Sequence, residues 1–310
     1  MSLQRSVDKM ARAGGSTDGQ GTLKWVWEKY SDPETGSPRW KKLAEVTRED
    51  HRQAWKQIDK SLGDMQISDI TSPIVARYVH VERADSPKRA NTEKALLSNL
   101  FGQGIKLGAC SVNATIGVEP HQLEARTEAP AAKLLEALLT WMGQQTTQRK
   151  LIGMAAEYAS LAGNRKCEFL KLTWPQVDRE AKQIRIIRAK QRGKKRETIV
   201  EVIAISDDME GLLTRLEALR LGRECLYVFP TRDGNKYSDK GFQSIWQRCI
   251  QDAIADQVLT TKNRFTFHDL RAYYATKHKL VRGSLPDLHA NPQTTARVYD
   301  RNKEVFRSAN

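Results

Sequence analysis

The sequence has 310 residues, of which 39% are hydrophobic, and this length and composition predict two ordinary globular domains. No apolar run approaches the length of a membrane span, and the first residues lack the apolar stretch of a secretory signal, which argues against membrane and secreted proteins. Lys and Arg number 51 against 37 Asp and Glu, and the resulting net charge of +14 favours a polyanionic partner.

The positive charge is concentrated in the second half of the chain. Residues 1–126 carry 19 basic and 16 acidic side chains, whereas residues 127–310 carry 32 and 21. A solvated basic surface would give the same counts, so charge alone admits nucleic acid as a partner without requiring it. The four cysteines are far apart and lack metal-ligand spacing, and they are typical of buried thiols in a reducing, cytosolic compartment.

The first half of the chain predicts a small, all-helical domain. Residues 1–21 are rich in Gly, Ser, Thr and Gln and are expected to form a flexible leader. Helical patterns follow from residue 22, over 50–62, from a Thr-Ser-Pro cap at 71–73, and over 88–107. The last of these has an expected apolar face of Ala95, Leu96, Leu100, Phe101 and Ile105. We therefore expect a helical domain over residues 22–120.

A polar stretch containing proline follows, and we expect a linker at residues 121–130. Beyond it, helices are predicted near 131–144, 149–162, 207–221, 238–255, 268–281 and 294–306. Two short β-rich segments, 183–189 and 198–205, flank the basic run 190–197 and indicate a β-hairpin with a basic tip. Residues 131–310 are thus expected to form a mixed α/β domain, and the whole chain to be mainly α with a small β-sheet.

Three short motifs in the second half carry residues suited to phosphate chemistry. Gly163, Arg165 and Glu168 form a GxRxxE pattern in which the carboxylate can orient the guanidinium, although most such pairs are surface ion pairs. His268 and Arg271 share one helix face and could clamp a phosphate, although ordinary helix starts look the same. A tyrosine near the end of a chain, such as Tyr299, is by itself usually a packing residue. The fixed order of these motifs around a lysine-bearing hairpin is far more specific than any one of them.

This order resembles the tyrosine recombinase (phage integrase) family. The run Ala162–Asp178 resembles the family's first-arginine motif, Phe267–His278 its HxxR helix, and His289–Arg301 its nucleophile segment. In the first half, Arg89–Val118 resembles the final helix of the core-binding domain. The resemblance covers two domains and implies a helical core-binding domain joined to a mixed α/β catalytic domain.

The resemblance also implies a chemistry and a role for each motif residue. Tyr299 would attack the scissile phosphate and form a 3′-phosphotyrosine, with no metal or nucleotide cofactor. Arg165 and Arg271 would bind the non-bridging phosphate oxygens, with Glu168 holding the cluster behind them. The remaining catalytic roles would fall to His268 and His289, which bind the phosphate or move a proton, and to Lys190, which protonates the leaving group.

The hairpin tip leaves the identity of that lysine open, because Lys194 and Lys195 lie close to Lys190. Together with Arg192 and Arg196, these lysines are also expected to bind DNA phosphates. The resemblance implies double-stranded DNA attachment sites as the partner, a homotetramer on DNA, and room for an accessory DNA-bending or directionality factor, but no membrane. The expected location is the cytoplasm of a bacterial host, at the nucleoid.

Two other functions remain open on the sequence alone. A type IB topoisomerase uses the same chemistry but reseals the original strand, and the recombinase-like first half argues against it. A catalytically impaired DNA-binding relative is favoured by the stretch from Arg271 to His289, which is shorter than usual for the family. The intact set of Arg165, His268, Arg271 and Tyr299 argues against this second alternative.

Overall fold

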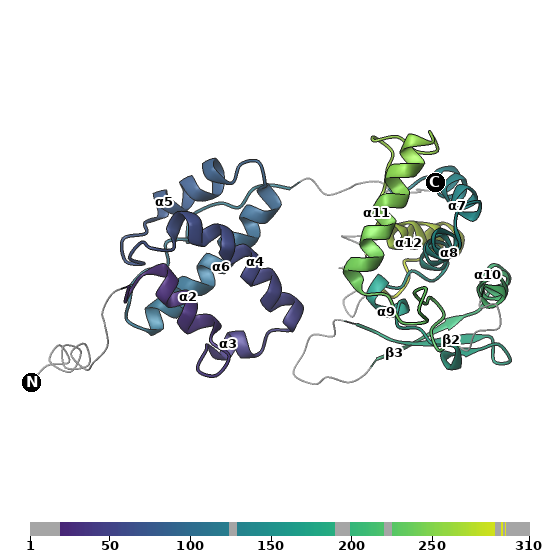
Figure 1. Cartoon of the computed structure of the whole chain (residues 1–310), viewed down its shortest axis with the longest axis horizontal. Helices are drawn as coiled ribbons and strands as arrows, with labels where there is room; N and C mark the ends of the chain where they lie inside the picture. The colour runs from purple at the N-terminus through teal and green to yellow at the C-terminus, as the bar shows by residue number, and fades with distance from the viewer. Residues whose placement is uncertain are drawn as a thin grey trace, which may run out of the picture. The chain divides into compact units, whose positions relative to one another are not determined.

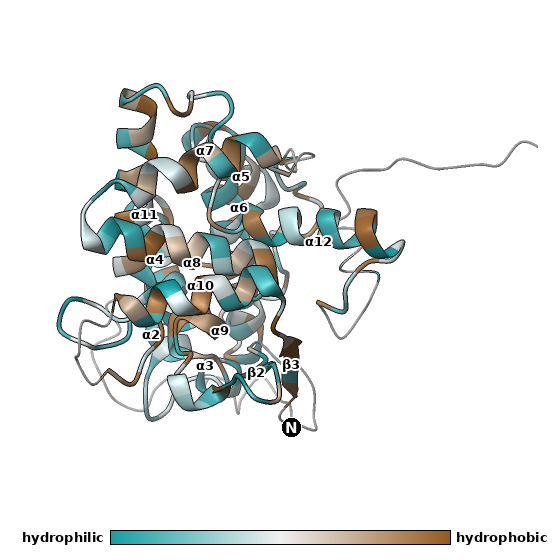
Figure 2. Ribbon diagram, turned by 90° about the vertical axis from the view of Figure 1, so that its right-hand side faces the viewer, coloured by the Kyte–Doolittle hydropathy of each residue, from teal (hydrophilic) through white to brown (hydrophobic). Residues whose placement is uncertain are grey.

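The computed structural model describes residues 19–123, 129–189, 199–219 and 225–288, together with residues 293 and 295. The chain divides into two compact units, Met1–Ala125 and Arg126–Asn310. Each unit has its own buried hydrophobic core. Its helices carry apolar and polar residues on opposite sides, which gives the mixed brown and teal ribbons of Figure 2. No helix in the described ranges is long and apolar enough to cross a membrane.

The first unit is entirely helical in its described part (Figure 1). Its elements are α2 (Leu23–Ser31), α3 (Pro38–Lys41), α4 (Glu45–Leu62), α5 (Ser72–Arg77), the π-helical turn η1 (Tyr78–Glu82) and α6 (Pro87–Lys106). An aromatic cluster fills the space between α2, α3 and α4. Trp27 stacks on Trp55 with ring centroids 5.0 Å apart, and Trp40 meets Trp27 edge-on at 5.7 Å. Large rings of this kind bury much apolar surface in a small domain.

Two asparagines fix the end of this unit. The Asn91 side chain donates to the His121 carbonyl at 2.9 Å and accepts from the His121 backbone N–H at 2.8 Å. The Asn113 carboxamide oxygen accepts from the Thr115 backbone N–H at 3.0 Å and from its hydroxyl at 2.8 Å. Both asparagines lie in the segment that resembles the family's last core-binding helix, and both hold irregular backbone that follows α6.

The sequence patterns located these helices but missed some of their limits. The helix expected over 50–62 begins at Glu45. The sequence pattern missed this start, because the first turn is polar and carries no apolar periodicity. The expected apolar face of α6 is wrong at two positions: Ala95 is exposed and Ile105 is 43% exposed, while Leu97 is fully buried. Helical spacing alone cannot decide which neighbouring apolar position faces the core.

The second unit combines helices with a small antiparallel sheet, as the sequence predicted. Its helices are α7 (Ala132–Gly143), α8 (Thr147–Ala162), α9 (Lys166–Phe169), the 3-10 turn η2 (Trp174–Gln176), α10 (Asp207–Ala218), α11 (Asp239–Ala255) and α12 (Asp269–Arg282). The buried helix α8 packs against α7, α10, α11 and α12. It is the centre of this unit, and its C-terminal end leads directly into the first-arginine motif.

The sheet has the order β1–β2–β3, with β1 at Val177–Asp178, β2 at Gln183–Ile187 and β3 at Val200–Ala204. The two longer strands pair in antiparallel register, with Ile187 opposite Val200 (Figure 1). On β2 the side chains of Ile184 and Ile186 are buried, as the alternation of a strand with one covered face requires. The predicted hairpin is confirmed in its two strands, and its basic tip lies outside the described residues.

Candidate active site

Arg165 begins the short helix α9 and is held by Glu168 in two ways. The Glu168 carboxylate accepts from the Arg165 backbone N–H at 2.6 Å and from its guanidinium at 2.9 Å. The Glu168 side chain is fully buried, whereas the Arg165 side chain remains 16% exposed. The same carboxylate accepts from the backbone N–H of Ala189 at 2.8 Å. A single buried carboxylate therefore fixes the first arginine and the end of the hairpin's first arm, next to Lys190.

The turn before Arg165 depends on a glycine. Gly163 ends α8 with φ of +67°, a left-handed conformation that is unfavourable for other residues. A Cβ at this position would lie 2.1 Å from a carbon of the Tyr274 ring on α12. Gly163 is thus needed both for the turn and for the close approach of α8 to α12.

Arg271 ties the HxxR helix to this turn. It lies on α12, is 2% exposed, and donates through Nη1 to the Gly163 carbonyl. Its Nη2 donates to the Leu288 carbonyl at 2.7 Å. The two arginine motifs, more than a hundred positions apart in sequence, therefore meet around one peptide group. The bonds to two carbonyl oxygens also fix the plane of the guanidinium.

His268 is the residue immediately before α12, and it is exposed. Its carbonyl accepts from the Arg271 backbone N–H at 3.2 Å. The neighbouring Asp269 is buried, and its carboxylate accepts from the Thr266 backbone N–H and hydroxyl, both at 2.7 Å. These bonds set the path of the chain through His268, so the imidazole lies at the accessible start of the helix that carries Arg271.

The other predicted site residues lie outside the described residues: Lys190, Arg192, Lys194, Lys195, Arg196, His289 and Tyr299. The described neighbours of two of them are nevertheless held by the site. Ala189 precedes Lys190 and is bound by Glu168, and Leu288 precedes His289 and is bound by Arg271. The described part of the site thus holds Ala189 and Leu288, the residues after which the segments with Lys190 and His289 begin.

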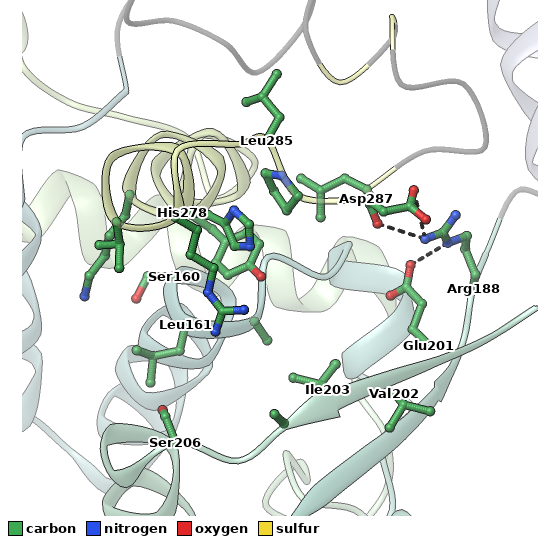
Figure 3. A pocket seen from close by; sticks show the side chains of 18 of the residues that line it. Ser160, Leu161, Arg188, Glu201, Val202, Ile203, Ser206, His278, Leu285 and Asp287 are labelled. Atoms are coloured by element: carbon green, nitrogen blue, oxygen red, sulfur yellow. Dashed lines mark hydrogen bonds and ion pairs between the residues drawn. The ribbon is translucent and has the colours of Figure 1, made fainter.

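Sequence reasoning missed a second polar cluster beside this one (Figure 3). Arg188, just after β2, donates through Nε to the Glu201 carboxylate at 2.5 Å and through Nη2 to the Asp287 carbonyl at 2.9 Å. The other oxygen of Glu201 accepts from the Asn164 side chain at 2.8 Å. The only sequence signal was a pair of opposite charges on facing arms of the expected hairpin, and Asp287 could not be foreseen because it is distant in the chain.

A cavity of about 940 Å³ opens next to this cluster. It is formed by the end of α8, by β3, by α12 and by residues 285–288, and its lining includes Arg188, Glu201 and His278. Among the described residues, Arg165, His268 and Arg271 do not line it. The cavity therefore borders β3 and Arg188 and is separate from the three motif residues.

Comparisons with known proteins agree with this arrangement. The profile of the Phage integrase family matches residues 127–303, more than half of the chain. A search of curated protein sequences finds no match. Among solved structures, the Tn1549 transposon integrase in complex with circular intermediate DNA is similar, with a TM-score of 0.69 at 15% identity over 92% of this chain and 96% of that one.

Lambda integrase is similar as well. A dimer bound to a COC′ core site gives a TM-score of 0.65 at 14% identity, covering 87% of this chain and 93% of that one. A tetramer bound to a Holliday junction gives 0.67 at 14% identity, covering 99% of this chain and 87% of that one. At these identities the structural likeness shows the shared fold, and the sequence profile shows the family. The chain belongs to the phage integrase family and is a tyrosine recombinase.

Proposed function

We propose that this recombinase cuts and rejoins DNA attachment sites through a 3′-phosphotyrosine on Tyr299. The observation that carries the proposal is the bond from Arg271 to the Gly163 carbonyl, which draws together the two arginine motifs. Guanidinium groups carried by two motifs that meet at one turn are suited to the charge that develops on a phosphate under attack. Arg165 and Arg271 are the proposed ligands of its non-bridging oxygens, with Glu168 as the buried support.

The proposed step conserves the energy of the phosphodiester. The Tyr299 oxygen forms a new bond to phosphorus, and the bond from phosphorus to the 5′-oxygen breaks. A proton passes to that 5′-oxygen from Lys190, or from Lys194 or Lys195 at the same hairpin tip. His268 or His289 accepts the proton that Tyr299 loses, and the other histidine donates a hydrogen bond to the phosphate. A 5′-hydroxyl from the partner duplex then attacks the phosphotyrosine, so the strands are exchanged without a metal or nucleotide cofactor.

Six of the seven other tyrosines are poor candidates for the nucleophile. Burial raises the pKa of Tyr30, Tyr78, Tyr158, Tyr237, Tyr273 and Tyr274. A raised pKa disfavours the tyrosinate that attacks phosphorus. Tyr273 and Tyr274 lie two and three positions after Arg271 on α12, and both are affected in this way. The seventh, Tyr227, lies outside the segment that resembles the family's nucleophile motif, whereas Tyr299 lies within it.

The proposed partners follow from the family and from the solved relatives. Residues 22–120 would be the core-binding domain, with residues 1–21 as a leader before it and residues 121–130 as the linker to the catalytic domain at 131–310. A lambda integrase tetramer is bound to a Holliday junction in its solved structure, and we propose that this chain also acts as a DNA-bound homotetramer. The tip residues Arg192, Lys194, Lys195 and Arg196 would contact phosphates. We also propose that the protein acts in the cytoplasm of a bacterial host, with an accessory DNA-bending or directionality factor as a further partner.

The test uses a nicked suicide substrate, from which the short 5′-hydroxyl strand diffuses away after cleavage and traps the covalent intermediate. On a denaturing gel the wild type should give a protein–DNA band, and Tyr299→Phe, which removes only the hydroxyl, should give none. Tyr227→Phe is the matched control and should retain the band. Absence of an adduct from wild-type protein on DNA that it demonstrably binds would favour the catalytically impaired relative.

A further inference from the structure

The polar cluster around Arg188 joins three segments of the second unit. Arg188 follows β2, Glu201 lies on β3, and Asp287 lies in the segment after α12. The Arg188 guanidinium reaches both others, at 2.5 Å to the Glu201 carboxylate and at 2.9 Å to the Asp287 carbonyl (Figure 3). One side chain thus connects the hairpin to the segment that leads to His289 and Tyr299.

This cluster is shielded in a way that surface ion pairs are not. The side chains of Arg188 and Glu201 are only 9% and 14% exposed. Asn164 is 4% exposed and donates to Glu201, and Tyr158 is fully buried and donates to Asn164 at 3.4 Å. A shielded, charge-assisted bond is stronger and better oriented than an exposed one. A chain of hydrogen bonds from the buried Tyr158 through Asn164 and Glu201 therefore fixes the Arg188 side chain.

What Arg188 binds in the last segment is main chain rather than a side chain. The Asp287 carboxylate is 80% exposed and lies 3.7 Å from the guanidinium, whereas the Asp287 carbonyl accepts a hydrogen bond. The next carbonyl, that of Leu288, is bound by Arg271 at 2.7 Å. Two arginines thus bind successive carbonyls immediately before His289. The backbone is therefore held at two successive residues before the segment that contains Tyr299.

We propose that Arg188 is a positioning residue for strand cleavage, which holds the segment carrying His289 and Tyr299 in register with Arg165 and Arg271. The inference rests on the proposed function of Tyr299 and adds a residue that acts on the nucleophile's side of the reaction. A guanidinium suits this task because its planar fork can serve two acceptors at once, and the single ammonium of lysine cannot do so in the same geometry.

The test compares single-turnover cleavage by wild type, Arg188→Met and Arg188→Lys at saturating protein. Misplacement of a nucleophile slows chemistry, so we expect Arg188→Met to slow adduct formation about 10- to 100-fold. Arg188→Lys should also be slowed while keeping the wild-type melting temperature, which separates positioning from folding. The matched control is Arg185→Met, because Arg185 lies on β2 close before Arg188, is exposed, and loses the same charge.

Two further readouts identify how Arg188 acts. The affinity for DNA and its salt dependence should be unchanged, since a direct phosphate contact would reduce the salt slope by about 1 when removed. A substrate with sulfur at the 5′-bridging position has a leaving group that needs no proton. The defect should persist on this substrate, because Arg188 is proposed to act on the nucleophile and not on the leaving group.

The outcomes separate this inference from the proposed function. Wild-type adduct formation with normal rates in both Arg188 variants would overturn the inference and leave Tyr299 as the nucleophile. A defect that disappears with the sulfur substrate, or one that comes with a lowered salt slope, would also overturn it, in favour of the hairpin lysine or a DNA contact. No wild-type adduct on bound DNA would overturn the proposed function and this inference together.

Discussion

Gly163 is the residue on which the meeting of the two arginine motifs depends. Its left-handed backbone turns the chain from α8 into Arg165, its carbonyl accepts from Arg271, and its missing side chain admits the Tyr274 ring. Glu168 then fixes Arg165 from the other side through two hydrogen bonds. In the proposed phosphate site, the Glu168 carboxylate thus holds Arg165, and backbone carbonyls hold Arg271.

Gly163→Ala should destabilise the second unit through two effects. Backbone strain at positive φ costs about 1 kcal/mol or more, and the clash with the Tyr274 ring adds about 1–3 kcal/mol. Gly283→Ala is the matched control: Gly283 also ends a helix with φ of +74°, but a Cβ there would have no neighbour within 4 Å. Urea unfolding of both variants measures the difference. Equal losses of unfolding free energy would show that the contact with Tyr274 is unimportant.

His51 gives the first unit a predicted sensitivity to acid. Burial lowers the pKa of His51, which packs against the rings of Tyr30 and Trp40, and its Nδ1 is buried without a hydrogen-bond partner in the described structure. The pKa of His51 is lower in the folded than in the unfolded protein, so protonation favours the unfolded state. The stability that this pKa difference contributes is fully present above about pH 6.5, the ordinary pKa of histidine, and is lost as the pH falls through the folded pKa. We expect unfolding free energy of this unit to decrease from pH 7.5 to 5.

The measurement is urea unfolding at several pH values, with His51→Phe as the variant that removes the titrating group. Its stability should depend less on pH than that of wild type. His80→Gln is the control, because His80 is exposed. An unchanged pH dependence in His51→Phe would assign the acid sensitivity to other groups.

At the scale of elements, the π-helical turn η1 is held to α6 by an ion pair between the buried Glu93 and the partly exposed Arg83. Glu93 on α6 is fully buried and accepts from Arg83 through both oxygens, at 2.8 and 2.9 Å, and from the Tyr78 hydroxyl at 3.0 Å. The bidentate geometry gives each carboxylate oxygen a donor. The irregular turn between α5 and α6 is therefore fixed by side chains in place of regular helix bonds.

Glu93→Ala should be destabilising, because it leaves the buried Tyr78 hydroxyl without its acceptor and removes the carboxylate that binds Arg83. A buried polar group left without a hydrogen-bond partner costs about 1–3 kcal/mol. Glu82→Ala is the control, since Glu82 pairs with Arg77 at 3.6 Å on the surface and such pairs contribute about 0–1 kcal/mol. Denaturant unfolding of the two variants checks this. A loss below about 1 kcal/mol for Glu93→Ala would contradict the assigned role.

The elements were largely predictable from sequence, and the contacts between them were not. Apolar periodicity located α4, α6, α8 and α11, and β-rich composition located both strands of the hairpin, because these signals are local. The short helices α3 and α9 escaped, since four residues carry no periodicity.

The same division between local and long-range contacts applies to the candidate site. Arg165, Glu168, His268 and Arg271 were recognisable because they lie in short motifs with fixed spacing. The bond from Arg188 to Asp287 joins residues 99 positions apart and leaves no local trace in the sequence. The bond from Arg271 to Gly163 spans 108 positions, and only the order of motifs hinted at it.

At the scale of the whole molecule, charge and family agree on DNA as the partner. The net charge of +14 is carried mostly by residues 127–310, which nearly coincide with the 127–303 range matched by the family. A polyanion bound by such a surface releases counterions, so affinity for DNA should fall steeply with salt. The proposed chemistry, however, depends on one hydroxyl and not on this general attraction.

The measurement that tests this central claim most directly is the identification of the residue joined to DNA. The trapped adduct would be digested with nuclease and protease and analysed by mass spectrometry. We expect a phosphate-linked nucleotide on the peptide that contains Tyr299. A nucleotide on Tyr273, Tyr274 or any other side chain would contradict the proposal, which assigns the attack to the Tyr299 hydroxyl alone.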